Sequence, residues 1–124
     1  MPYDEKALER LQEAVADLAL EPSEDITEKK MFGGICLLLN GSILAGMSGD
    51  EFLIRLSEED MEEALDRPHV RRMMMRERPV KHFAFVEPAG FADDALVGEW
   101  LRKGLTYVRE WRRLDAAKTR TRRK

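Results

Sequence analysis

The central stretch of the chain, residues 33–56, reads GGICLLLNGSILAGMSGDEFLIRL and decides the fold. It contains the longest apolar run of the sequence, Ile35–Leu39, in which every position is apolar. Such a run is typical of a strand in the middle of a sheet with cover on both faces. The preceding Gly33-Gly34 pair permits a positive φ angle or a bulge, so we expect a corner where the chain enters this strand.

Two chain reversals follow the apolar run. Asn40-Gly41 fits a two-residue type I′ turn, which requires positive φ at both positions. Residues 48–50 supply a second turn before Glu51–Leu56, where Leu53 and Arg55 lie on the face opposite to Phe52, Ile54 and Leu56. The stretch therefore predicts three antiparallel strands joined by short turns, with residues 42–47 as the middle strand.

Helices and further strands are expected on either side of these strands. Asp4 can cap a helix that Pro22 stops, and residues 26–30 form a short extended piece. After the third strand, Ser57 can cap a short acidic helix that ends at Pro68. Residues 67–79 show no clear period, whereas residues 80–87 alternate like a strand.

The last element is a long helix from residue 93 or 94 to about Ala117, with a wide apolar face that includes Trp100 and Trp111. Gly104 lies near the centre of that face, which indicates close approach to a strand. We therefore predict an α+β, two-layer fold: an antiparallel sheet of about four to five strands (a meander over 26–56 plus 80–87) with the N-terminal and long C-terminal helices packed on it.

One domain over residues 1–117 accounts for nearly all of the 124 residues, of which 44% are hydrophobic and 36% charged. Residues 118–124 read KTRTRRK and carry five positive charges. They contain no apolar residue that would offset the entropy of ordering, so they are predicted to be a disordered basic tail. The net charge is −3 overall, so residues 1–117 carry −8.

The sequence argues against several classes of function. The apolar run is too short to cross a bilayer and no secretory signal is evident, so we expect a cytoplasmic protein without membrane contact. Cys36 is the only cysteine, and in an apolar strand it is expected to be a small buried hydrophobe with a raised pKa. His69 and His82 lack metal-ligand spacing, and the glycines form no phosphate-binding motif. We therefore expect no catalytic residues, no metal and no cofactor.

A Met/Arg segment, residues 71–78, is the main candidate for contact with a partner. It reads RRMMMRER, and its thioethers and guanidinium groups suit an adaptable surface for an acidic or apolar partner. The alternative is that methionines fill the core and arginines pair with the acidic helix before them. The predicted contact residues are Arg71, Arg72, Met74, Arg76 and, near the end of the last helix, Trp111, which would mark a subunit interface if its ring is partly exposed.

Six short motifs, taken in their order and spacing, resemble the N-terminal domain of the TfoX/Sxy family. They are KKMFGG (29–34), the Asn40-Gly41 turn, AGMSGD (45–50), ALDRPHV (64–70), RPVK (78–81) and VEPAG (86–90). The residues that carry the resemblance most clearly are Met31, Phe32, Gly33, Gly34, Asn40, Gly41, Gly49, Arg67, Pro68, Arg78 and Pro79. The resemblance implies an antiparallel sheet with packed helices, and no catalytic residues are transferred from it.

Longer members of that family are regulators of natural competence that carry a second, helical domain, for which this chain has no room. We therefore expect a stand-alone, non-enzymatic module that binds another protein, or a second copy of itself, and is linked to transcriptional regulation or competence. The alternative is weak, direct nucleic-acid binding through Arg120, Arg122, Arg123 and Lys124 together with the Met/Arg segment. A third hypothesis is an enzyme, which would require titratable groups that converge in a polar pocket.

Overall fold

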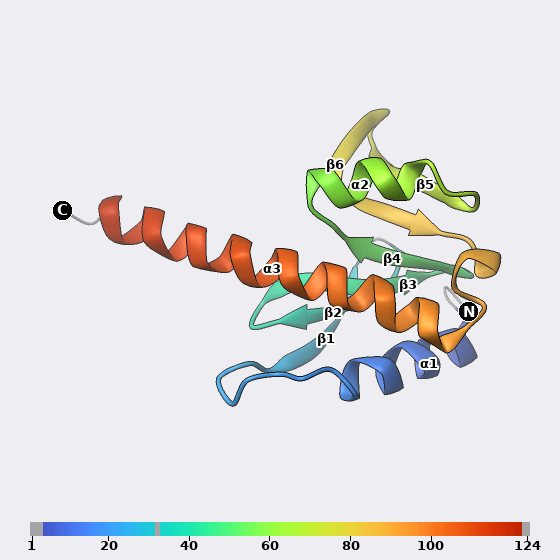
Figure 1. The fold of residues 1–124 in the computed structure, drawn as a ribbon, viewed down its shortest axis with the longest axis horizontal. Helices are drawn as coiled ribbons and strands as arrows, with labels where there is room; N and C mark the ends of the chain where they lie inside the picture. The colour runs from blue at the N-terminus through green and yellow to red at the C-terminus, as the bar shows by residue number, and fades with distance from the viewer. Residues whose placement is uncertain (1–3, 32, 123–124) are drawn as a thin grey trace.

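The computed structural model describes residues 4–31 and 33–122, and these form an α+β fold with one antiparallel sheet (Figure 1). The elements are α1 (Glu5–Ala16), β1 (Ile26–Met31), β2 (Gly34–Leu39), β3 (Ser42–Ser48), β4 (Glu51–Arg55), α2 (Glu58–Leu65), β5 (Val70–Met75), β6 (Arg78–Val86), the short 3₁₀ helix η1 (Pro88–Phe91) and α3 (Asp94–Arg122). The predicted fold class is confirmed.

The strands lie in the order β1-β2-β3-β4-β6-β5, and every neighbouring pair is antiparallel. The predicted meander is confirmed, and Asn40 and Gly41 have φ angles of 47° and 89°, as a type I′ turn requires. The predicted number of strands was too low, because the described residues contain six. The additional strand is β5, which lies within the segment 67–79 that shows no clear period.

β5 forms because it pairs with β6 along its length, from Val70 opposite Val86 to Met75 opposite Arg78. The two strands are joined by Arg76 and Glu77, whose φ angles of 49° and 65° again describe a type I′ turn. The pairing is irregular between residues 72 and 74, and this irregularity breaks the alternation on which sequence reasoning depends.

All three helices of the described chain pack on one face of the sheet (Figure 1). α1 and α2 each start with a side-chain cap. The carboxylate of Asp4 accepts hydrogen bonds from the backbone N–H groups of Lys6 and Ala7, and the Ser57 hydroxyl accepts one from the backbone N–H of Asp60. The buried cluster beneath them joins residues from α1, α2 and α3 to residues from the strands. No helix in the described part of the chain is long and apolar enough to cross a membrane.

α3 lies across β3 and β4, and Gly104 marks its closest approach. A Cβ atom at Gly104 would lie 2.8 Å from Ile54 Cδ1 and 3.0 Å from the carbonyl oxygen of Arg55, so the predicted close contact is confirmed. The helix continues to Arg122, beyond the end predicted near Ala117, since the Ala, Lys and Arg residues there favour helix and no Gly or Pro interrupts them.

Candidate functional site

The face of the sheet opposite to the helices, called here the open face, carries a second hydrophobic cluster. Its buried members are Cys36, Leu53 and Met73, and the partly exposed residues packed against them are Met31, Ile43, Val80, Phe83 and Phe85. Every member comes from a strand, so no helix of the described chain covers this cluster. The open face is therefore an apolar surface that remains partly accessible to solvent.

Basic side chains lie beside the hydrophobic cluster of the open face. Strand register places three of them on the open face: Lys29 beside Cys36, Arg55 beside Phe83, and Arg71 beside Phe85. The guanidinium of Arg71 lies 4.7 Å from the centre of the Phe85 ring and forms an ion pair with Glu51, the neighbouring carboxylate on β4. The whole chain is acidic, so the open face differs in charge from the rest of the protein.

Arg55 joins the open face to α3. Its guanidinium carbon lies 5.5 Å from the centre of the Phe83 ring, 5.7 Å from that of Tyr107 and 4.6 Å from that of Trp111. The Nε atom is buried and has no hydrogen-bond partner among the described residues. Burial lowers the pKa of Arg55, although a guanidinium stays protonated at neutral pH.

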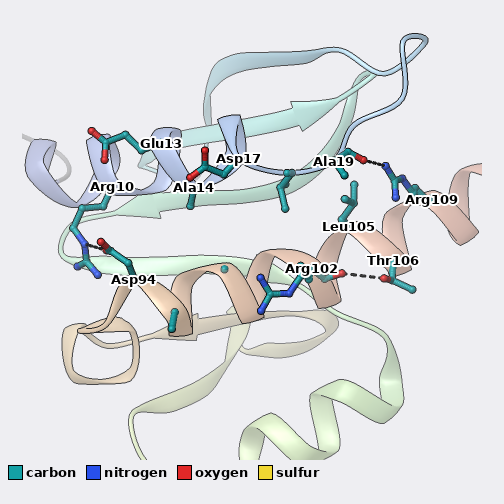
Figure 2. A pocket seen from close by; sticks show the side chains of 13 residues that line it. Arg10, Glu13, Ala14, Asp17, Ala19, Asp94, Arg102, Leu105, Thr106 and Arg109 are labelled. Atoms are coloured by element: carbon teal, nitrogen blue, oxygen red, sulfur yellow. Dashed lines mark hydrogen bonds and ion pairs between the residues drawn. The ribbon is translucent and has the colours of Figure 1, made fainter.

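A groove of about 680 Å³ runs between α1 and α3 (Figure 2). Ala14, Gly98 and Leu105 give it an apolar lining. At one end, Arg10 Nε donates to a carboxylate oxygen of Asp94 at 3.0 Å, so the two helices are tied together there.

The other end of the groove is closed by Arg109. Its guanidinium donates to the Glu24 carboxylate at 2.6 Å and to the carbonyl oxygen of Ala19 at 2.9 Å. The hydrogen bond from Arg109 lowers the pKa of Glu24 and in turn raises the pKa of Arg109. Between the two ends, Figure 2 shows the Thr106 hydroxyl donating to the backbone carbonyl of Arg102. The described lining of the groove contains no Cys, His or Ser.

The histidines and the cysteine stand in separate surroundings. His69 Nδ1 lies 3.6 Å from the Glu87 carboxylate, whereas His82 Nδ1 lies 3.0 Å from the Leu56 carbonyl oxygen and its ring stacks on Tyr107 at 4.9 Å. Cys36 is 1% exposed, and burial raises the pKa of its thiol, as the sequence predicted. The described residues contain no cluster of His, Cys, Asp or Glu that could hold a metal ion.

The predicted contact residues of the Met/Arg segment lie on the edge strand β5 and in the turn that follows. Met73 is buried in the cluster of the open face, so one methionine fills the core, whereas Met74 is 52% exposed. Arg71 is paired with Glu51, and Arg72 donates to the carbonyl oxygens of residues 80 and 81. Arg76 lies in the β5–β6 turn.

Trp111 lies on a different part of the molecule, on α3, where it is 36% exposed beside Arg55. Of the predicted nucleic-acid contacts, Arg120 and Arg122 belong to the last turns of α3, and Arg123 and Lys124 lie outside the described residues. The structure thus separates the two halves of the predicted nucleic-acid surface, because the β5–β6 turn and the end of α3 point away from the sheet in different directions (Figure 1).

The residues that carry the family resemblance occupy corners of the fold. Gly33, Gly41 and Gly49 have positive φ, Asn40 begins the β2–β3 turn, Gly34 begins β2 and Met31 ends β1. Arg67 pairs with Glu63 and Glu99 beside Pro68, Arg78 and Pro79 begin β6, and Phe32 lies outside the described residues. These positions shape the backbone, and none of them belongs to the hydrophobic cluster of the open face except Met31.

Sequence reasoning missed Arg55 and the arginines of the groove. The available signal for Arg55 was a cation in an otherwise apolar strand, Phe52–Leu56. Arg10 and Arg109 gave no signal, because isolated arginines on helices are usually solvated and their partners lie more than eighty residues away in the sequence.

Comparison with known protein families gives one match. The model of the family described as TfoX N-terminal domain matches residues 18–107, a range that includes every strand, α2 and the first half of α3. No curated protein and no solved structure matches the chain.

Proposed function

The chain belongs to the TfoX N-terminal domain family, and on that premise we propose that it is a regulatory module that binds another protein and catalyses no reaction. The regulatory link, to transcription or competence, follows from what the longer family members do. The observation that carries the binding function is the open face, an apolar surface with cations that no helix of the described residues covers.

The composition of the open face indicates the kind of partner. Met31, Ile43 and Phe83 are partly exposed and would lose further apolar surface to water on binding. Lys29 and Arg55 would repel a second cationic surface, so the same face of another copy is a poor partner. A protein segment that combines apolar and acidic side chains matches both properties.

The chemistry of the described residues supports binding over catalysis. The Cys36 thiol is buried and held in its neutral form by a raised pKa. His82 is packed on Tyr107, and His69 lies beside Glu87. A reaction would require nucleophile, base and substrate cavity in one place, and these groups lie in different places.

The test uses two adjacent lysines on β1 that lie on opposite faces. Lys29 pairs with Cys36 on the open face, and Lys30 pairs with Ile35, which packs against the helix-side core. Both are exposed, so reversing either charge should leave the fold intact. Tagged wild-type chain, Lys29→Glu and Lys30→Glu would be crosslinked in cells and their captured proteins quantified.

We expect a specific protein that Lys29→Glu loses and Lys30→Glu retains. Capture of nothing above background in several growth conditions would contradict the proposal, and so would equal capture by both variants. Direct nucleic-acid binding is the alternative, and it predicts duplex binding at low salt that disappears when residues 118–124 are removed. The structure supports it less, because Arg71 and Arg72 are engaged within the protein.

A further inference from the structure

The C-terminal end of α3 projects beyond the sheet (Figure 1). The buried face of the helix includes Leu105 and Val108, which are almost completely covered. Further along the helix, Trp111 is 36% and Leu114 is 55% exposed. Trp111, which packs on Arg55 of β4, and Leu114, about one turn further on, therefore form a partly exposed apolar pair near the end of the helix. A projecting helix gains stability from packing rather than from propensity alone.

The sequence of the projecting end has a net positive charge, unlike the rest of the chain. Residues 110–124 contain seven basic and two acidic residues, a net charge of +5, and the remaining residues 1–109 carry −8. After Gly104, no Gly or Pro interrupts the helix up to Arg122, so this end cannot bend back onto its own body. The charge of the projecting end can be matched by acidic groups of another molecule.

Acidic groups lie at the corner from which α3 projects. α2 begins immediately after β4, and its first turn is Glu58, Glu59 and Asp60. The end of β4 is held close to α3, because the Arg55 guanidinium lies 4.6 Å from the centre of the Trp111 ring. The corner therefore combines an acidic helix start, an apolar centre and a basic projecting helix.

Several of these charged side chains make no ion pair with the described residues. Among the described residues, neither Glu58 nor Glu59 makes an ion pair, and Arg113, on the projecting end, makes none either. The acidic and basic parts of the corner are thus available to a surface of the opposite sign.

We propose that a second copy of this chain docks at this corner around a two-fold axis. The projecting end of α3 of each copy lies against the start of α2 of the other, and Trp111 and Leu114 of both copies meet in the middle. A two-fold axis makes each contact twice, so one acidic and one basic element per copy suffice for a self-complementary interface. Packing the two projecting ends against each other alone would instead oppose two net charges of +5.

The proposed interface is formed by the end of α3 and the start of α2, and it adjoins the open face only at Arg55, so it does not rest on the proposed function. It is tested by sedimentation equilibrium of the full chain at about 50 mM and about 500 mM NaCl, since salt screens contacts between exposed charges. We expect a dimer that weakens at the higher salt concentration. The Trp emission should shift to the blue on association, and the change reports Trp111 because Trp100 is already buried in the single chain.

The first variant is Leu114→Glu, which places an acid at the apolar centre. We expect it to raise the dimer dissociation constant at least about tenfold. Met75→Glu is the matched control, because Met75 is 49% exposed and lies on the far edge strand. It should leave association unchanged. Urea unfolding of both variants verifies that each one is folded.

A charge exchange tests the pairing of α2 with α3. Glu58→Lys combined with Glu59→Lys should weaken the dimer severalfold, and addition of Arg113→Glu should restore part of the affinity. Three results would overturn the proposal: a monomer at all concentrations up to about 0.5 mM, a dimer unaffected by Leu114→Glu, or no recovery in the charge exchange. Duplex DNA binding by a chain that stays monomeric would assign the projecting helix to nucleic acid instead.

Discussion

Gly34→Ala is expected to lower the free energy of unfolding by about 3 kcal/mol, the upper end of the usual cost of overpacking. A Cβ atom at Gly34 would lie 1.9 Å from the carbonyl oxygen of Met47 and 2.9 Å from the Cα of Ser48. Both atoms belong to the backbone of β3, which cannot rotate away as a side chain can. β2 and β3 would have to separate locally, and their pairing would weaken.

Gly33→Ala is the matched control at the neighbouring position. Gly33 has a φ angle of +74°, and a Cβ atom there would have nothing within 4 Å. Its cost is therefore only that of a left-handed backbone, about 1 kcal/mol. Gly33→Asn should cost less still, because Asn tolerates this conformation better than Ala.

Urea unfolding followed by the emission of the buried Trp100 measures all three variants. For a domain of 124 residues, 3 kcal/mol corresponds to a decrease in Tm of roughly 10 °C. Equal costs at the two glycines, or a larger cost for Gly33→Ala, would refute the reasoning, since close approach of β3 would then not be what excludes a side chain at position 34.

Three further predictions follow from single contacts. Arg109→Met should make the free energy of unfolding depend less on pH in the acid range, because the hydrogen bond from Arg109 lowers the pKa of Glu24 below its ordinary 4.5. The stabilisation from this pair is complete above pH 4.5 and is lost as the pH falls through the lower pKa of Glu24 in the folded state. Replacing Arg76-Glu77 by Asn-Gly should raise the unfolding free energy by about 1 kcal/mol, since both positions have positive φ. Cys36 should react with a thiol reagent at pH 8 only as fast as the protein opens, because it is 1% exposed and its pKa is raised.

Each of these has a result that would contradict it. An unchanged acid unfolding curve for Arg109→Met would show that the ion pair does not persist in solution. A turn variant with unchanged or lower Tm would mean that residues 76 and 77 do not adopt positive φ. Rapid labelling of Cys36 in the absence of urea, at the rate of a free thiol, would show that the open face leaves the thiol accessible.

The meander could be predicted because its signals are local. The Asn40-Gly41 pair fixes one turn, and the apolar alternation from Glu51 fixes the faces of the next strand, where Leu53 does lie opposite to Phe52 and Ile54. These signals need no information about distant partners, so they remain visible in the sequence.

β5 could not be predicted, because its cues are atypical. Its turn is formed by Arg76 and Glu77 rather than by Asn-Gly, and its pairing with β6 is irregular between residues 72 and 74. The partner strand β6 is atypical as well, because it contains Pro79 near its start. The structure explains why a proline is tolerated at this position. β4 pairs with β6 only from Phe83 onward, so on the β4 side no strand lies beside Pro79 that would need a backbone N–H from it.

The open face illustrates why the site was harder to predict than the fold. Its cations are separated in the sequence and are brought to one face only by strand register, which pairs Lys29 with Cys36 and Arg71 with Phe85. Sequence reasoning found Arg71 because it stands beside other arginines and methionines. Lys29 entered only as part of the KKMFGG motif and was not predicted to contact a partner.

The apolar run Ile35–Leu39 was expected to need cover on both faces, yet helices cover only one. Cys36 is nevertheless almost completely buried, because the cluster on the open face surrounds it with longer side chains, Met31 and Leu53 among them. Cover from within the same layer buries the small side chain at the centre but leaves the outer surface of Met31 and Phe83 partly in water. An apolar run of this kind therefore implies either a second covering layer or a sheet face with apolar surface that is still partly exposed to water. The described residues of this chain show the partly exposed face, and a docking partner would bury that surface.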